Sequence, residues 1–222
     1  MSTRAQVIRI TARVQLYVDH NSAPEKNNRD VAVWLEPLHV TALPRTSETK
    51  SNHFSVVQQG HAFAPHVLIV PVGAEVNFPN HDLIFHNAFS LFEGKRFDLG
   101  LYEAGTSKRV NFDRPGIAYV FCNIHYDMSA IILALSSPYY GLTDRKGMVK
   151  INGVPPGQYR LRVWAEGASA ETLAGLAREI RVEQDSFIGN IRVETAPAVT
   201  MVHTNKYGLP YDSHTNEESY GR

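Results

Sequence analysis

Short runs of alternating hydrophobic and polar residues, separated by turn-forming residues, most constrain the fold of this chain. Residues 7–18 repeat with a period of two, which is the pattern of a strand with one buried face. The pattern predicts a row of core-facing side chains formed by Ile8, Ile10, Ala12, Val14, Leu16 and Val18. This segment is therefore predicted to be a half-buried strand.

Similar runs follow along the rest of the chain, and Gly, Pro, Asn and Asp stand between them. One short helix is predicted over 168–177. Strands are predicted over 31–38, 54–59, 66–72, 74–78, 107–113, 116–122, 129–135, 147–151, 158–166, 178–184 and 188–194. Many short strands with turn signals between them predict an all-β fold of the sandwich or barrel type.

The spacing of these runs also predicts a division of the chain. A central β-sandwich is expected over 50–136 and a second β-module over 137–195. The strands of 1–49 are expected to join one of these two modules. Residues 196–222 have no hydrophobic periodicity, so they are predicted to form an extended or disordered tail unless their tyrosines dock on the body.

Composition excludes several classes of function. The chain has 22 basic and 22 acidic residues, and a net charge of zero argues against nucleic acid as the main partner. No apolar run approaches the roughly 18 residues of a membrane span. A single cysteine cannot form an internal disulfide, and the first residues show no apolar stretch typical of a signal peptide.

That single cysteine lies in the segment CNIHYDM, residues 122–128, together with a histidine and a methionine. Residues three apart on a strand point to opposite faces, so Cys122 and His125 converge only if the chain turns after the strand. Asn123 tolerates turn conformations. Two intervening residues are a familiar separation for ligands of one metal ion, and Met128 returns to the same centre if the turn continues.

A further ligand is expected from His86, which follows a predicted strand and the turn at Pro79-Asn80. A sandwich brings such distant segments together at one end. Two imidazoles, a thiolate and a weak thioether favour copper in a blue-copper electron-transfer site, whereas zinc prefers four strong ligands and calcium or magnesium prefers oxygen. Four filled positions leave none for a substrate, so an electron carrier is expected rather than an enzyme.

Two other interpretations of these residues remain open. Cys122 could be a small buried hydrophobe, with surface histidines and a core methionine around it. Cys122 and His125 could also form a catalytic nucleophile and its base, but Met128 has no role in that arrangement.

The segment resembles the cupredoxins, the superfamily of plastocyanin, amicyanin and pseudoazurin. The Cys-x-x-His-x-x-Met loop is similar to the short ligand loop of amicyanin, and the wider region resembles a bacterial plastocyanin-like family associated with methylamine utilisation. The resemblance extends over about 54–166, and the segments that carry it are residues 58–90, 95–105, 110–130 and 141–166.

The resemblance implies a Greek-key β-sandwich with one type 1 (blue) copper ion bound by His86, Cys122, His125 and Met128. It also implies that Asn87 pins the two ligand loops by hydrogen bonding. Residues 147–164 resemble a small transthyretin-like or carboxypeptidase-regulatory β-module.

The expected function is to carry single electrons between periplasmic redox proteins, such as a dehydrogenase or a cytochrome, through transient docking. The periplasm is expected from the resemblance, although no signal peptide is visible. An apolar rim for docking could be formed by Phe63, Ala64, Pro65, Phe85, Ile124 and Tyr126. His81 could lie near the copper, and His203 and His214 in the tail could bind copper weakly. Copper(I) storage or delivery, and a cell-envelope binding module with incidental copper, are the alternative functions.

Overall fold

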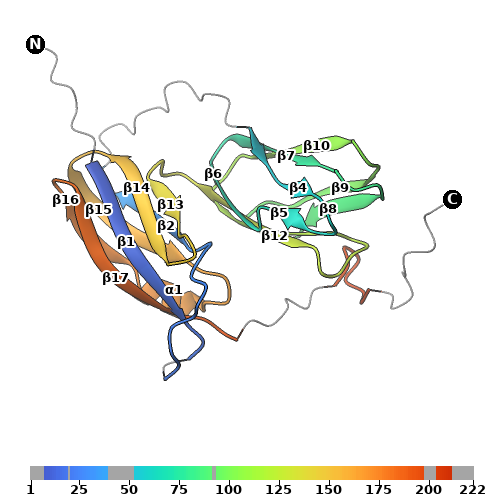
Figure 1. Cartoon of the computed structure of the whole chain (residues 1–222). Coiled ribbons are helices and arrows are strands. Elements are labelled where there is room, and N and C mark those ends of the chain that lie inside the picture. The colour runs from blue at the N-terminus through green and yellow to red at the C-terminus, as the bar shows by residue number, and fades with distance from the viewer. Residues whose placement is uncertain (1–7, 20, 40–52, 92–93, 198–203, 212–222) are drawn as a thin grey trace, which may run out of the picture. The chain divides into compact units, whose positions relative to one another are not determined.

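The computed structural model describes residues 8–19, 21–39, 53–91, 94–197 and 204–211 (Figure 1). These residues divide into two compact units. Unit 1 comprises residues 1–47 and 137–199, and unit 2 comprises residues 48–136 and 200–222. Strands make up every element of the described residues except one short helix. The predicted all-β fold class is therefore confirmed.

Unit 1 contains two sheets. The first has the order β14-β1-β17, formed by β14 (Met148–Val154), β1 (Ile8–Tyr17) and β17 (Ser186–Glu194). The second has the order β13-β2-β15-β16, formed by β13 (Tyr140–Leu142), β2 (Ala32–Pro37), β15 (Gly157–Trp164) and β16 (Arg178–Val182). Helix α1 (Ala170–Gly175) is capped by Ser169, whose side chain accepts a hydrogen bond from the backbone of Thr172.

The core of unit 1 is formed by the inward rows of these strands. Ile8, Ile10, Ala12 and Val14 of β1 are all buried, as their alternation predicts. They pack with side chains from the second sheet, including Leu35 and Leu161. The β1 strand lies between an antiparallel neighbour, β14, and a parallel one, β17.

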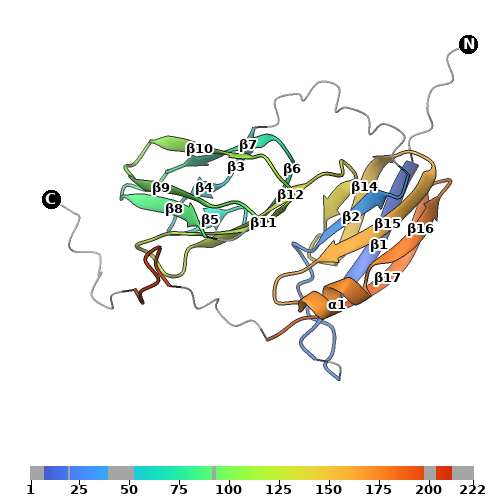
Figure 2. The same cartoon turned by 180° about the vertical axis from the view of Figure 1, so that it is seen from behind.

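Unit 2 is also built from two main sheets, seen from both sides in Figures 1 and 2. The smaller sheet has the order β10-β7-β3, from β10 (Ser107–Phe112), β7 (Ala74–Pro79) and β3 (Phe54–Ser55). The larger has the order β6-β12-β11-β8-β9, from β6 (Val67–Pro71), β12 (Ser129–Leu135), β11 (Gly116–Phe121), β8 (His86–Ser90) and β9 (Phe97–Tyr102). The short strands β4 (Val57–Gln58) and β5 (Phe63–Ala64) form a separate pair.

The core of unit 2 contains two of the residues singled out from the sequence. Cys122 and Met128 are fully buried and belong to the same cluster of core side chains as Phe78, Phe112 and Ile132. The candidate metal-binding loop is therefore attached directly to the hydrophobic core of this sandwich.

Candidate metal centre

The ligand loop is the connection of a β-hairpin. Strands β11 and β12 pair antiparallel, and Phe121 stands opposite Ser129 at the end of the ladder. The Cys122 N–H donates to the Met128 carbonyl at 3.2 Å, and the Met128 N–H donates to the His125 carbonyl at 3.3 Å. Cys122 and Met128 thus lie side by side where the loop leaves the sheet, and His125 lies within the turn.

His86 is held by a different part of the same sheet. It is the first residue of β8, which lies next to β11, and its side chain is completely buried. The preceding loop is shaped by Asn80, whose amide donates to the Ile84 carbonyl at 2.8 Å and whose side-chain oxygen accepts the Asp82 N–H at 3.0 Å. The turn predicted at Pro79-Asn80 lies slightly further along the chain: β7 ends at Pro79, Asn80 bridges to Gln58, and the chain bends at 82–84 before the strand that carries His86.

These two segments bring three donor atoms together. The Nδ1 atoms of His86 and His125 are 3.1 Å apart, and the Cys122 sulfur lies 3.5 Å from His125 Nδ1 and 4.0 Å from His86 Nδ1. All three donors lie within 4.8 Å of one another. The structure thus contains a His–Cys–His cluster.

The separations fit one shared ion. One ion could reach all three donors with bonds of about 2.0 Å to nitrogen and about 2.3 Å to sulfur, because two such bonds span at most about 4.3 Å and the Cys122 sulfur lies 4.0 Å from His86 Nδ1. Two histidines and a cysteine are the strong ligands of blue-copper sites. The donor set and its spacing therefore suit copper.

The side chain of Met128 has no exposed surface and belongs to the same core cluster as Cys122. A buried thioether at the end of the Cys-His loop could supply copper with a weak further ligand.

Burial controls the charge state of the three donors in the metal-free protein. Burial raises the pKa of the Cys122 thiol, although hydrogen bonds from the backbone of Ile124, Asn87 and His125 act to lower it. Burial and the neighbouring histidines lower the pKa of His125 to about 4. Burial also lowers the pKa of His86, outweighing the opposing effect of Asp82. The imidazoles are consequently neutral at pH 7 and free of the proton that would compete with a metal.

Sequence reasoning missed Asp82. Its carboxylate accepts a hydrogen bond from His86 Nε2 at 2.8 Å, so Nε2 carries the proton and the Nδ1 lone pair is left for a metal. The same carboxylate accepts the backbone N–H groups of Gly60 and His61 at 2.6 and 3.1 Å. Burial acts to raise the pKa of Asp82, but these hydrogen bonds lower it below its usual value.

His61 was not singled out from the sequence. It is exposed, but its ring centroid lies 5.2 Å from that of His125 and 6.1 Å from that of His86. The only sequence signal for this contact is Gly60 beside it, since both residues adopt positive φ in a tight turn.

Asn87 contacts the cysteine loop through its backbone and not through its side-chain amide. Its backbone N–H hydrogen-bonds to the Cys122 sulfur, but its side-chain amide donates to Asp98 of β9 at 2.8 Å. The side-chain oxygen of Asn87 is buried and has no hydrogen-bond partner among the described residues. The side-chain link to the cysteine loop therefore passes through other residues.

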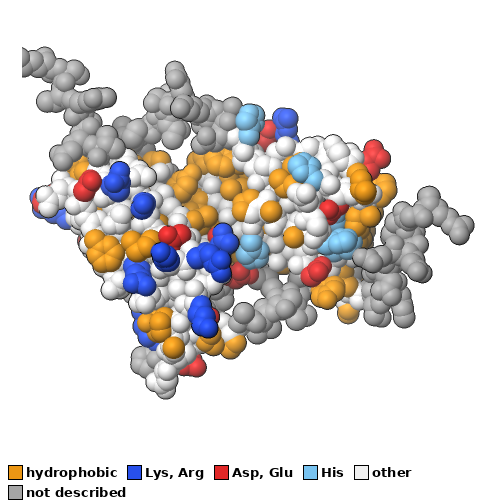
Figure 3. Space-filling model, viewed as in Figure 1, with side chains coloured by type: hydrophobic (Ala, Val, Ile, Leu, Met, Phe, Trp, Pro, Cys, Tyr) orange, Lys and Arg blue, Asp and Glu red, His pale blue; other side chains and the backbone are white. Residues whose placement is uncertain are grey.

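The residues expected to form an apolar rim differ in exposure. Phe63 is buried in the core, and Ile124 is partly buried against it. Phe85 and Tyr126 are 45% and 64% exposed, and Leu83, which was not predicted, is 95% exposed. Ala64 and Pro65 are exposed as well. In Figure 3, several histidines and separate groups of hydrophobic side chains are visible on one face of unit 2.

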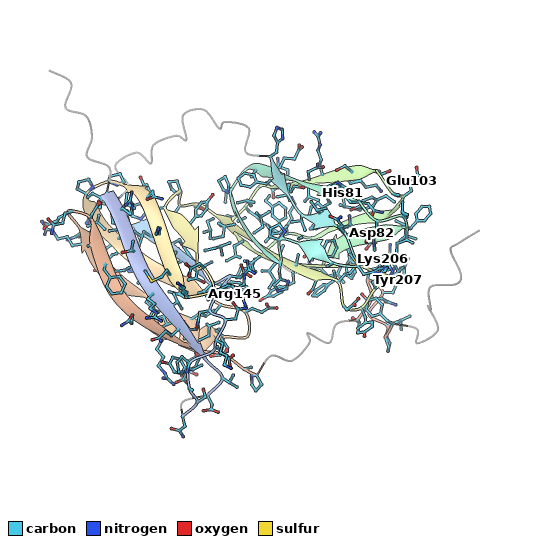
Figure 4. All side chains as sticks on the ribbon, in the orientation of Figure 1. His81, Asp82, Glu103, Arg145, Lys206 and Tyr207 are labelled. Atoms are coloured by element: carbon cyan, nitrogen blue, oxygen red, sulfur yellow. The ribbon has the colours of Figure 1, made fainter. Side chains whose placement is uncertain are left out.

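His81 does not join the cluster. His81 is exposed, and its backbone N–H donates to the Gln58 carbonyl. His203 and His214 lie outside the described residues. Figure 4 shows His81 and Asp82 on unit 2.

Within the described part of the chain, no helix is long and apolar enough to cross a membrane.

Comparisons with known proteins give cupredoxin neighbours. A purple cupredoxin from Nitrosopumilus maritimus is 20% identical over 37% of this chain and 99% of its own, with a TM-score of 0.34. A copper-containing nitrite reductase from Thermus scotoductus SA-01 is 27% identical over 45% of this chain and 25% of its own, with a TM-score of 0.37. A reduced amicyanin variant is 16% identical over 40% of this chain and 87% of its own, with a TM-score of 0.36. No family model matches the chain. No curated protein matches it either.

Proposed function

We propose that this protein is a one-electron carrier that binds a single type 1 copper ion through His86, Cys122, His125 and Met128. The observation that supports the proposal is the convergence of two Nδ1 atoms and one sulfur within 4.8 Å. Bound copper supplies a one-electron redox couple, Cu(II)/Cu(I).

The chain itself supplies rigidity. His86 starts a strand and Cys122 follows one, and neither side chain has exposed surface. Asp82 fixes the orientation and tautomer of His86, and three backbone N–H groups point at the Cys122 sulfur. Donors held in this way move little when the charge of the site changes by one unit. Because four donors complete the site, no position is left for a substrate, which favours a carrier over an enzyme.

The surroundings of His125 suit brief docking. His125 is partly exposed, unlike the other two donors, and exposed hydrophobic side chains lie close to the ligands in sequence. These are Leu83, Phe85 and Tyr126. A small apolar surface of this kind suits a weak interface with a periplasmic dehydrogenase or cytochrome.

The test is a titration of the purified protein with Cu(II). An intense visible absorption from thiolate-to-copper charge transfer is expected, and Cys122→Ser should abolish it. Met128→Leu should keep the colour but shift its band and the reduction potential, whereas Met148→Leu, a matched change in unit 1, should leave both unchanged. A colourless protein that binds Cu(II) weakly would refute the proposal.

A second measurement separates the carrier from a copper(I) storage or delivery protein. Fast, reversible one-electron voltammetry is expected of a carrier. Transfer of copper to an acceptor without redox cycling would instead support delivery.

A further inference from the structure

The C-terminal residues 204–211 return to unit 2 and contact the ligand loop. The backbone N–H of Lys206 donates to the side-chain oxygen of Asn123 at 2.9 Å. The hydroxyl of Tyr211 donates to the carbonyl oxygen of Cys122 at 2.6 Å. Two consecutive residues of the ligand loop, one of them the cysteine, are thus held by a segment more than 80 residues further along the chain.

The same segment also reaches the strand that carries His86. The Lys206 ammonium group donates to one carboxylate oxygen of Asp98 at 2.7 Å. The other oxygen of Asp98 accepts the side-chain amide of Asn87 at 2.8 Å, and Asn87 follows His86 directly. Lys206 therefore connects the two parts of the site: its side chain bonds Asp98, the partner of Asn87, and its backbone bonds Asn123.

The shape of the segment is set by its own hydrogen bonds. Asn205 accepts the backbone N–H groups of Tyr207 and Leu209 through its side-chain oxygen at 2.9 and 3.1 Å, and the Gly208 N–H donates to its carbonyl at 2.9 Å. Figure 4 shows Lys206 and Tyr207 at the end of unit 2 where Asp82 lies. The turn thus presents Lys206 in a fixed conformation.

The two hydrophobic side chains in the middle of this segment do not hold it by burial. Tyr207 and Leu209 are 72% and 59% exposed, and residues 204–211 contribute no strand to either sheet. Directed hydrogen bonds join the segment to the ligand loop and to Asp98. Such contacts add little to the core, but they restrict where the Cys122 backbone can lie.

We propose that residues 204–211 are a positioning element of the metal centre, in which Lys206 and Tyr211 hold the Cys122–Asn123 backbone in the geometry that places the cysteine sulfur against the two imidazoles. The part of this inference that concerns copper rests on the proposed function. The part that concerns the loop does not, because it holds for the metal-free protein.

The first experiment uses the fact that Cys122 is the only cysteine in the chain. In the metal-free full-length protein, a thiol reagent reports how often the buried loop opens. Tyr211→Phe and Lys206→Met are each expected to raise the rate of labelling about twofold to tenfold, the effect of losing one hydrogen bond. Lys206→Arg keeps a charged donor for Asp98 and should restore a rate close to that of the wild type.

Two matched controls exist in the chain. Tyr159→Phe removes a tyrosine-to-carbonyl hydrogen bond of 2.8 Å in unit 1. Lys95→Met removes a lysine–aspartate pair of 2.8 Å, with Asp113, elsewhere on unit 2. Neither control should change the labelling rate. Rates in Tyr211→Phe and Lys206→Met that equal those of the controls would overturn the inference.

The second experiment asks whether the segment affects the copper centre as well as loop opening. In copper-loaded protein, Tyr211→Phe and Lys206→Met should change the copper hyperfine splitting and the ratio of the visible bands, which a merely stabilising contact would not do. Faster labelling with unchanged spectra would overturn the positioning role. A wild type without thiolate-to-copper absorption, combined with faster labelling of the variants, would refute the proposed function alone and support the holding of the loop.

Discussion

The carboxylate of Asp82 should lower the reduction potential of the proposed copper centre. It lies 2.8 Å from His86 Nε2, across the imidazole ring from the Nδ1 donor. An ion bonded to Nδ1 at about 2.0 Å would lie about 7 Å from the carboxylate oxygen. A negative charge at that distance favours Cu(II) over Cu(I), because the oxidised ion carries one more positive charge.

The size of the effect follows from Coulomb's law. At an effective dielectric constant of about 20, unit charges about 7 Å apart interact by about 2.4 kcal/mol. For one electron this corresponds to about 100 mV, since a factor of ten is about 59 mV. The side chain of Asp82 is 16% exposed, so solvent screening reduces the shift, and about 50 mV results if the effective dielectric constant is doubled to about 40.

Asp82→Asn is the suitable change, because its amide oxygen can still accept the His86 N–H while the charge is lost. Spectroelectrochemical titration should show a potential raised by about 50 to 100 mV. Asp144→Asn is a matched control, because Asp144 accepts two backbone N–H groups in a turn of unit 1, from Lys146 and Met148. A rise below about 20 mV, a fall, or a shift equal to that of the control would refute the electrostatic reasoning.

Two further predictions concern the stability of the fold and of the metal-free site. Gly147 has φ +78°, and a Cβ there would lie 1.9 Å from the Val14 carbonyl oxygen, whereas Gly189 has φ +100° and open space. Gly147→Ala should therefore lower the free energy of unfolding in urea by about 2 kcal/mol more than Gly189→Ala, and equal losses would show that the close approach is relieved at no cost. The folded pKa of His125 is about 4, below the usual 6.5, so between these values the unfolded chain binds more protons and the metal-free protein loses stability as the pH falls from about 6.5 toward 4. His125→Gln should flatten the dependence of the unfolding free energy on pH, measured by urea unfolding at pH 6.5, 5.5 and 4.5. An unchanged slope would contradict the assignment of the lowered pKa to His125.

The strands with regular alternation could be predicted from the sequence alone. In β1 the inward row from Ile8 to Val14 is buried as the period of two requires. The ligand loop was also predictable, because three-residue spacing between Cys122, His125 and Met128 requires a turn, and the structure closes that turn as a hairpin.

Strand β8, which begins at His86, and its neighbour β9 could not be predicted in this way. All five residues of β8 are buried, so the segment has no alternation, and polar residues such as His86 and Asn87 are typical of a loop. β9 contains Gly100 at positive φ, and the pairing of β8 with β9 shifts register between Asn87 and Phe89. Tertiary packing, not local pattern, makes these two segments strands.

Hydrophobic periodicity also could not predict the contacts between distant loops. Asp82 meets Gly60 and His61 through a turn whose backbone adopts positive φ, and Tyr211 meets Cys122 across 89 positions. A carboxylate in a loop and a tyrosine in a polar tail are both ordinary at the sequence level. Only the folded sandwich places them next to the donors.

The three donors differ in the contacts that hold them in place. His86 is fixed by a strand and by Asp82, and Cys122 by a strand end and backbone N–H groups. His125 lies within the hairpin loop, next to the rings of His61 and His86, and it is the donor with some exposure. Changes at the exposed Tyr126 can therefore alter the surface around His125 while His86 and Cys122 keep their strand and backbone contacts. Tyr211 contacts Cys122 and Lys206 contacts Asn123, where the buried part of the ligand loop meets its exposed part. Residues 204–211 can therefore affect both the buried and the exposed part of the loop.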